Sequence, residues 1–160
     1  MKLIKVLGIG SPFGDDQAGW KVIEILKQQI ALPSEIASYV IIESHDRPGA
    51  RLIELINNAN TVFLIDAIKS NKEIGTIHQF NKEEIIAPEN QFSTHGIGVL
   101  QALQLANALN ALPNNIIFYG IEIDVIVLDS TLSPYVQSAV EKLAAQLKKE
   151  LSNSSLIYQS

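Results

Sequence analysis

The sequence predicts a three-layer α/β/α sandwich built on a five-stranded, mostly parallel sheet with one antiparallel strand. Apolar runs of strand length alternate with segments of helical periodicity, and the run at residues 61–67 is apolar on both faces. Such continuous runs are typical of parallel strands that helices cover on both sides. Ligands of these sheets bind at the carboxyl ends of the strands, so the residues at that edge are the ones to consider for function.

The individual elements follow from the spacing of apolar residues and from the turn residues between them. A crossover between parallel strands needs about a dozen residues. Only a few polar residues separate the third strand, which ends at position 67, from the fourth. The fourth strand is therefore expected to be antiparallel and near an edge. The expected strands are residues 3–9, 39–42, 61–67, 75–80 and 115–123. The expected helices are residues 17–30, 50–57, 95–111 and 134–151.

Length and composition favour one domain and exclude several classes of function. A chain of 160 residues with 47% hydrophobic content suits a single core, and we expect residues 1–151 to form the domain and 152–160 a flexible tail. The net charge of −5 and the scattered basic residues argue against nucleic acid and anionic membranes as partners. The absence of cysteine excludes disulfides and thiolate chemistry. No segment approaches the ~20 apolar residues of a membrane span, and we expect a cytoplasmic protein.

The loop after the first strand combines three glycines with two adjacent carboxylates. Its GxGxxxG spacing is one residue longer than the dinucleotide fingerprint. A phosphate binds the bare amides of a helix N-terminus, a position that Asp15 and Asp16 would fill with like charge. A nucleotide-binding protein is therefore a disfavoured alternative. One aspartate suffices as the N-cap of the following helix, which leaves the other available for a cation.

Three polar residues from distant parts of the chain are expected at the carboxyl edge of the sheet. Asp16 comes from the first loop, Asp66 ends the third strand, and His95 opens the long helix. Two carboxylates and an imidazole suit a divalent ion such as zinc or nickel, with coordination positions left open. Each residue also has an ordinary structural explanation, with Asp66 as a hydrogen-bonded turn carboxylate and His95 as a helix-terminal residue.

The other two histidines are weaker candidates. His45 follows the second strand, but its neighbours Asp46 and Arg47 make a surface cluster of charges an equally good explanation. His78 lies within the expected antiparallel strand and is predicted to be structural. The sequence contains no HExxH zinc-peptidase motif, no GxSxG elbow and no GxxxxGK[ST] loop.

Several segments together resemble the hydrogenase maturation proteases, which trim the C-terminal extension from the large subunit of nickel-iron hydrogenases. These segments are VLGIGSPFGDDQAG, FLIDAI, STHGIGVLQAL, and FYGIEI followed by LSPYVQSAV. The resemblance covers nearly the whole chain in the same order, and it implies that Asp16, Asp66 and His95 are the metal ligands. Ser11 and Gln17 depart from the Asn and Gly that are frequent in the family. A further departure is the segment SHDRPG, which replaces a glycine-rich stretch.

The resemblance implies an endopeptidase whose partner is a nickel-loaded large-subunit precursor. The nickel would be borne by the substrate, and zinc or another divalent ion would occupy the site in the isolated protein. Either the metal polarises the scissile carbonyl or a carboxylate activates water, while Asp15 orients the loop. We expect weak metal binding without the precursor, and a monomer. A non-catalytic relative that docks on the precursor is the alternative from another functional class.

Overall fold

The computed structural model describes residues 2–87, 98–126, 128 and 131–153. Its strands form one sheet in the order β2-β1-β3-β5-β4. The strands are β1 (Ile4–Gly10), β2 (Val40–Asp46), β3 (Thr61–Ile68), β4 (Ile77–Phe80) and β5 (Asn115–Glu122). The α-helices are α1 (Ala18–Gln29), α2 (Ser34–Ala37), α3 (Leu52–Ile56), α4 (Lys82–Ile86), α5 (Val99–Ala108) and α6 (Pro134–Leu151). Two short 3-10 helices are η1 (Gly14–Gln17) and η2 (Gly49–Arg51).

The predicted mixed sheet is confirmed, including its antiparallel edge strand. β1 pairs in parallel with β2 and β3, and β3 pairs in parallel with β5. β4 pairs antiparallel with β5 at one edge of the sheet. The segment between β3 and β4 is too short to cross the sheet, as the sequence indicated.

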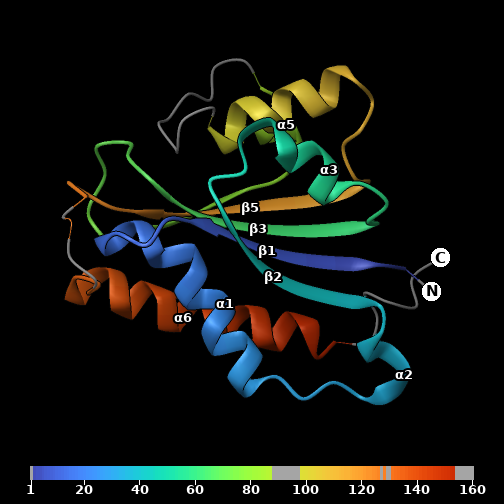
Figure 1. The fold of residues 1–160 in the computed structure, drawn as a ribbon, viewed down its shortest axis with the longest axis horizontal. Coiled ribbons are helices and arrows are strands. Elements are labelled where there is room, and N and C mark those ends of the chain that lie inside the picture. Colours follow the sequence, from blue (N-terminus) through green and yellow to red (C-terminus); the bar gives the residue numbers. More distant parts are fainter. Residues whose placement is uncertain (1, 88–97, 127, 129–130, 154–160) are drawn as a thin grey trace.

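Helices cover both faces of the sheet and divide the core into two parts. α1 and α6 pack on one face, and α3 and α5 pack on the other (Figure 1). The chain therefore leaves β1 along one face to reach β2 and leaves β2 along the opposite face to reach β3. Ligand sites of open α/β sheets lie where strand connections diverge in this way. The carboxyl ends of β1 and β3 are that point here.

The start of α1 lies directly on the ends of these two central strands. A Cβ atom on Gly19 would lie 2.3 Å from the carbonyl oxygen of Ile9 in β1 and 2.6 Å from that of Ile65 in β3. Only a residue without a side chain allows this approach. The turn η1, which precedes α1, is thereby held against the divergence point.

Three expected boundaries are wrong, one in β2 and two in the long helix. β2 extends through Asp46 rather than ending at Ile42, because its later residues continue the parallel ladder with β1. The long helix α5 begins at Val99 and not at His95, since Gly98 is its N-cap with extended backbone (ψ 159°). It also ends at Ala108, three residues before the expected position.

Other expectations concern the ends of the chain and membranes. α6 spans Pro134–Leu151 and buries the predicted inward residues, which are Val136, Val140, Leu143 and Leu147. Most of the expected tail, residues 154–160, lies outside the described residues, so the division into domain and tail stays a prediction. Among the described helices, none has the length and apolar character needed to cross a membrane.

Candidate functional site

Asp16 is buried in η1 by a set of bonds within the loop that follows β1. Its backbone N–H donates to the carbonyl of Phe13 (3.0 Å), and its carbonyl accepts from the N–H of Ser11 (3.2 Å). The hydroxyl of Ser11 also donates to the Asp16 carboxylate. The loop can close this tightly because Gly10 has no side chain. A Cβ atom at this position would lie only 2.7 Å from the carbonyl oxygen of Asp16. The glycine-rich sequence thus fixes the orientation of one carboxylate.

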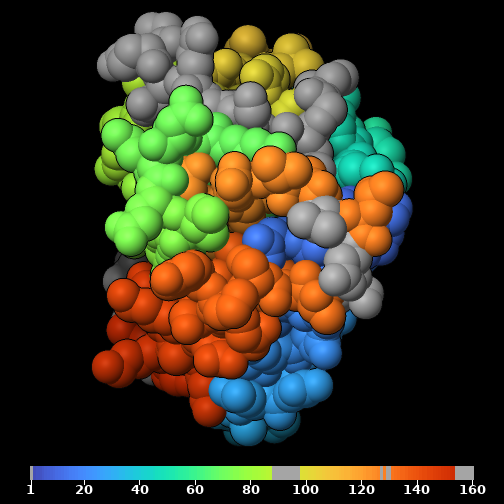
Figure 2. Space-filling view, turned by 90° about the vertical axis from the view of Figure 1, so that its left-hand side faces the viewer, coloured from blue at the N-terminus to red at the C-terminus, as the bar shows by residue number. Residues whose placement is uncertain are grey.

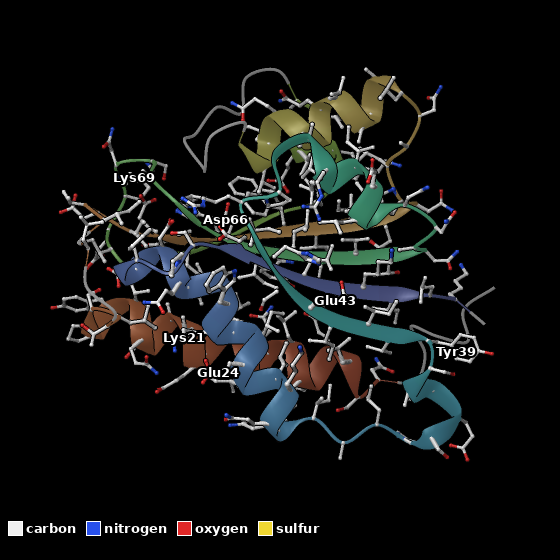
Figure 3. All side chains as sticks on the ribbon, viewed as in Figure 1. Lys21, Glu24, Tyr39, Glu43, Asp66 and Lys69 are labelled. Carbon is white, nitrogen blue, oxygen red and sulfur yellow. The ribbon has the colours of Figure 1, made fainter. Side chains whose placement is uncertain are left out.

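Asp66 is fully buried within β3. Its Oδ1 accepts a hydrogen bond from the N–H of Ala67 at 2.8 Å. Side chains alternate along a strand, so Asp66 shares the face of Leu64 and Ile68, which belong to the core under α3 and α5. Figure 3 shows Asp66 toward the carboxyl ends of the strands. The alternative explanation as a turn carboxylate is therefore wrong, because this carboxylate is part of the sheet.

The structure brings Asp16 and Asp66 to the same edge of the sheet. η1 packs against both β1 and β3, and Asp66 is the residue after Ile65, whose carbonyl lies under the start of α1. Water is excluded from both carboxylates, each of which is at least 97% buried. Burying an ionised carboxylate is costly unless it is compensated. Two buried carboxylates at the point where the strand connections diverge are therefore candidate residues of a functional site.

His95 lies outside the described residues, so its predicted place beside the two carboxylates stays a prediction. Among the residues that are described, no group of three or more His, Asp or Glu side chains is arranged to hold a metal ion. The described part of the site thus consists of two oxygen-donor side chains.

The two adjacent aspartates have different partners. The expectation that one of them is the N-cap of the following helix is wrong, because the N-cap of α1 is Gln17 and the N-cap of η1 is Phe13. Asp15 instead accepts hydrogen bonds from the N–H (2.7 Å) and the hydroxyl (2.8 Å) of Ser133, the N-cap of α6. The positive end of the α6 dipole favours this anion. Asp15 therefore links the loop after β1 to α6, and Asp16 is the aspartate of this pair that belongs to the candidate site.

The end of β2 forms a cluster of charges, which was the alternative explanation for His45, but the partner of His45 is Glu43 and not Asp46 or Arg47. His45 Nε2 lies 2.9 Å from Glu43 Oε2, and Arg47 Nε donates to Asp46 Oδ1 at 2.6 Å. This hydrogen bond to Asp46 is the main reason that the pKa of Arg47 is raised, and the charge of Asp16 adds to it. The N–H of Arg47 donates to the carbonyl of Gly10 (3.1 Å). The cluster therefore borders the loop that carries Asp16.

Sequence reasoning missed a third buried carboxylate at this edge, that of Glu122 at the end of β5. It accepts hydrogen bonds from the N–H (2.7 Å) and the hydroxyl of Ser70, and its Oε1 lies 3.0 Å from His78 Nε2. His78 also stacks on Phe80, with ring centroids 6.0 Å apart. These contacts give His78 the structural role that was predicted. The signal for Glu122 was a charged residue inside the apolar segment FYGIEI.

Comparison with known protein families shows to which family the chain belongs. A family model described as HycI, hydrogenase maturation protease, matches residues 20–150, well over half of the sequence. The chain belongs to the hydrogenase maturation protease family. The predicted resemblance is thereby confirmed, and the protein is a peptidase of the maturation type. The matched region includes Asp66 and His95 and begins four residues after Asp16.

Solved structures agree with this membership. The maturation protease is similar to the hydrogenase maturating endopeptidase HybD from E. coli, with 26% identity, 95% of this chain and 93% of that chain covered, and a TM-score of 0.79. It is also similar to the [NiFe] hydrogenase maturation protease HybD from Thermococcus kodakarensis, with 27% identity, coverage of 94% and 99%, and a TM-score of 0.71. HycI from the same archaeon, at 22% identity and TM-score 0.70, shares the fold over 95% and 94% of the two chains. The comparison with curated proteins found no match.

Proposed function

We propose that this maturation protease removes the C-terminal extension from a nickel-iron hydrogenase large-subunit precursor after nickel has been inserted. The observation that carries the proposal is the pair of buried carboxylates, Asp16 and Asp66, at the point where the connections of β1 and β3 diverge. The similar HybD of T. kodakarensis is a [NiFe] hydrogenase maturation protease, which supports this class of substrate.

In this proposal the protease recognises nickel that the precursor already holds. Asp16 and Asp66 supply carboxylate oxygens and His95 an imidazole nitrogen, a donor set that suits nickel and zinc. The donors on Ser11 and Ala67 hold the two carboxylates in fixed orientations. In the isolated protein, zinc or another divalent ion would be held by the same three side chains. A bound ion supplies Lewis acidity for peptide hydrolysis.

The chain's own groups then have two tasks. The carboxylates fix the position of the scissile segment relative to the site, and positioning of this kind accounts for a large part of catalysis. One of the two carboxylates would also act as general base, accepting a proton from the water that attacks the scissile carbonyl. Asp15 does not take part directly, because both of its oxygens accept hydrogen bonds from Ser133.

The test compares Asp16→Asn, Asp66→Asn and His95→Ala with the wild type. The substrate is a purified nickel-loaded precursor, and mass spectrometry measures loss of its extension. Each substitution is expected to lower the rate of processing about 100-fold or more and to leave the circular dichroism spectrum unchanged. Glu24→Gln, at an exposed position of α1, is the matched control and is expected to process normally.

Three results would contradict parts of this proposal. Normal processing by one of the three variants would remove that residue from the site. Equal cleavage of nickel-free precursor would exclude recognition of the metal. Tight binding of zinc to the isolated wild type in calorimetry would favour an ordinary metallohydrolase, because in this proposal the metal arrives with the precursor.

A further inference from the structure

β2 is an edge strand of the sheet and has a neighbouring strand on one side only. Its seven residues pair with β1 in an unbroken one-to-one register, and no other strand of the described chain pairs with it. The strand at the opposite side of the sheet, β4, has only four residues. Proteins commonly protect long edge strands with proline, lysine or a β-bulge, and β2 contains none of these. β2 is therefore a long edge strand without the usual protection.

The hydrogen bonds of β2 show which of its backbone groups face away from β1. The ladder begins with the bond from the N–H of Ile4 to the carbonyl of Tyr39 (2.8 Å) and ends with the bond from the N–H of Arg47 to the carbonyl of Gly10 (3.1 Å). With the one-to-one register, the odd-numbered residues from 39 to 47 direct their backbone groups to β1. The residues whose N–H and carbonyl groups point outward are Val40, Ile42, Ser44 and Asp46.

These outward groups have no hydrogen-bond partner in the described part of the chain. They form a row of donors and acceptors about 20 Å long, because a strand rises about 3.3 Å per residue. The middle of β2, at Glu43 and Ser44, is exposed, so another chain can approach it. A ligand that satisfies the whole row is itself an extended polypeptide, since a strand repeats donors and acceptors at this spacing.

β2 also runs directly toward the candidate site. Its last residue, Asp46, lies opposite Gly10 in the register with β1. Gly10 precedes Ser11, whose N–H and hydroxyl both bond to Asp16. Figure 2 shows the teal segment after β2 beside the blue loop after β1. A strand laid along the outer side of β2 would therefore have one end at the loop that carries Asp16.

Two hollows on other segments suit an extended chain less well. One of about 430 Å³ lies between the β3–β4 loop and the end of β5, with Lys69 and Asp124 in its lining. Another of about 410 Å³ lies between α1 and the start of α6, with Leu132 and Gln137 in its lining. Volumes of this size are typical of small-molecule pockets. Each hollow can receive a side chain, whereas the outer side of β2 can pair with a main chain along its whole length.

We propose that the C-terminal extension of the substrate binds as an added strand along the outer side of β2. This inference rests on the proposed function, in which the chain cleaves a precursor where its folded body joins the extension. Residues before the scissile bond belong to the folded body, so the extension is the part that is free to become a strand. With the scissile bond near Asp16, the extension runs from the carboxyl end of β2 to its amino end. It therefore pairs antiparallel with β2.

The first test removes one outward N–H in Ser44→Pro. Proline is tolerated in an edge strand where its nitrogen faces solvent, so the ladder with β1 is expected to persist. Ser44→Ala is the matched control, because it removes the exposed hydroxyl and keeps the N–H. With nickel-loaded precursor as substrate, Ser44→Pro is expected to raise KM about tenfold with kcat unchanged, and Ser44→Ala to keep the wild-type KM. Equal KM values for the two variants would overturn the proposal.

Two further results would assign the outer side of β2 or the extension elsewhere. Lys69→Glu reverses a charge in the lining of the larger hollow and is expected to process normally. A raised KM for Lys69→Glu with a normal KM for Ser44→Pro would overturn the proposal in favour of that hollow. A wild-type dimer in sedimentation that Ser44→Pro converts to monomers would also overturn it, because a second copy of this chain would then occupy β2.

Amide hydrogen exchange tests the added strand without altering β2. In the free Asp16→Asn protein, the N–H groups of Ile42 and Ser44 are expected to exchange quickly, and that of Glu43, which bonds to β1, slowly. Saturating nickel-loaded precursor is expected to slow exchange at Ile42 and Ser44 at least tenfold. Unchanged exchange in the complex, or slow exchange already in the free protein, would overturn the proposal and leave the proposed function intact. A wild type that processes no precursor would instead refute the proposed function.

Discussion

At the scale of single residues, two neighbouring carboxylates with similar sequence surroundings are directed to different tasks. The hydroxyl of Ser133 does not bond to a backbone N–H of its own helix and donates to Asp15 instead. Asp15 thus acts as the anion at the N-terminus of a helix whose N-cap, Ser133, lies 118 residues later in the chain. Its separation from Asp16 depends on this long-range partner.

The Asp15 and Ser133 pair gives a prediction about stability. Asp15→Ala removes both acceptors and is expected to lower the free energy of unfolding by about 1–2 kcal/mol. Ser133→Ala is expected to cost less, roughly 0.5–1 kcal/mol, because its N–H still donates to Asp15. Urea denaturation measures both values. The double variant should lose less than the sum of the two single losses, and strict additivity would show that the contact contributes nothing.

The sequence indicated Asp16 and Asp66 because each follows or ends an apolar strand, and strand ends are recognisable from pattern alone. Ser11, Ser133 and Glu122 were not predicted as site neighbours. Their roles come from partners at other places in the fold, such as Ser70 and His78 for Glu122. A single sequence gives the position of a strand end but not which hydroxyl will meet which carboxylate.

At the scale of elements, the close packing of α1 on β1 and β3 holds η1 in place. Gly19→Ala would place a methyl group against two backbone carbonyl oxygens, which cannot move without shifting the strands. We expect a loss of about 3 kcal/mol in the free energy of unfolding, the upper end of typical overpacking effects, measured by urea denaturation. Gln28→Ala, at an exposed position of the same helix, is the control and should stay within about 0.5 kcal/mol. An equal, small effect of both substitutions would mean that α1 does not depend on this close approach.

Elements with strong periodicity were predicted well, and those defined by tertiary contacts were not. α6 has a Ser-Pro start and a regular apolar stripe, so both of its ends were near the expected places. β2 continues to Asp46 only because β1 lies beside it, and polar residues in an edge strand look like a loop in the sequence. Likewise, the apolar pattern near His95 gave no sign that Gly98 would be the N-cap of α5.

At the scale of the whole molecule, burial of Tyr119 between the sheet and α6 links folding to alkaline pH. Burial raises the pKa of its phenol above the ordinary value of about 10, and the nearby Glu150 carboxylate acts in the same direction. The folded chain therefore keeps this proton when the unfolded chain releases it. The stabilisation is fully present below pH about 10 and is lost as pH rises above that value.

Thermal unfolding of the wild type and of Tyr119→Phe tests this link. The difference between the two melting temperatures should be constant from pH 7 to pH 9. Between pH 10 and pH 11 the melting temperature of the wild type should fall relative to that of Tyr119→Phe. Other tyrosines and the lysines titrate in both proteins and cancel in the comparison. A difference that does not change with pH would show that Tyr119 titrates normally.

The sheet also determines which parts of the molecule can be modified without interference. β1 begins and α6 ends at the end of the molecule opposite the carboxyl edge (Figure 1). An affinity tag or a fluorescent fusion joined beyond either of these two elements would therefore extend away from Asp16 and Asp66. Immobilising the protease through such a tag leaves the carboxyl edge of its sheet accessible to a precursor in solution.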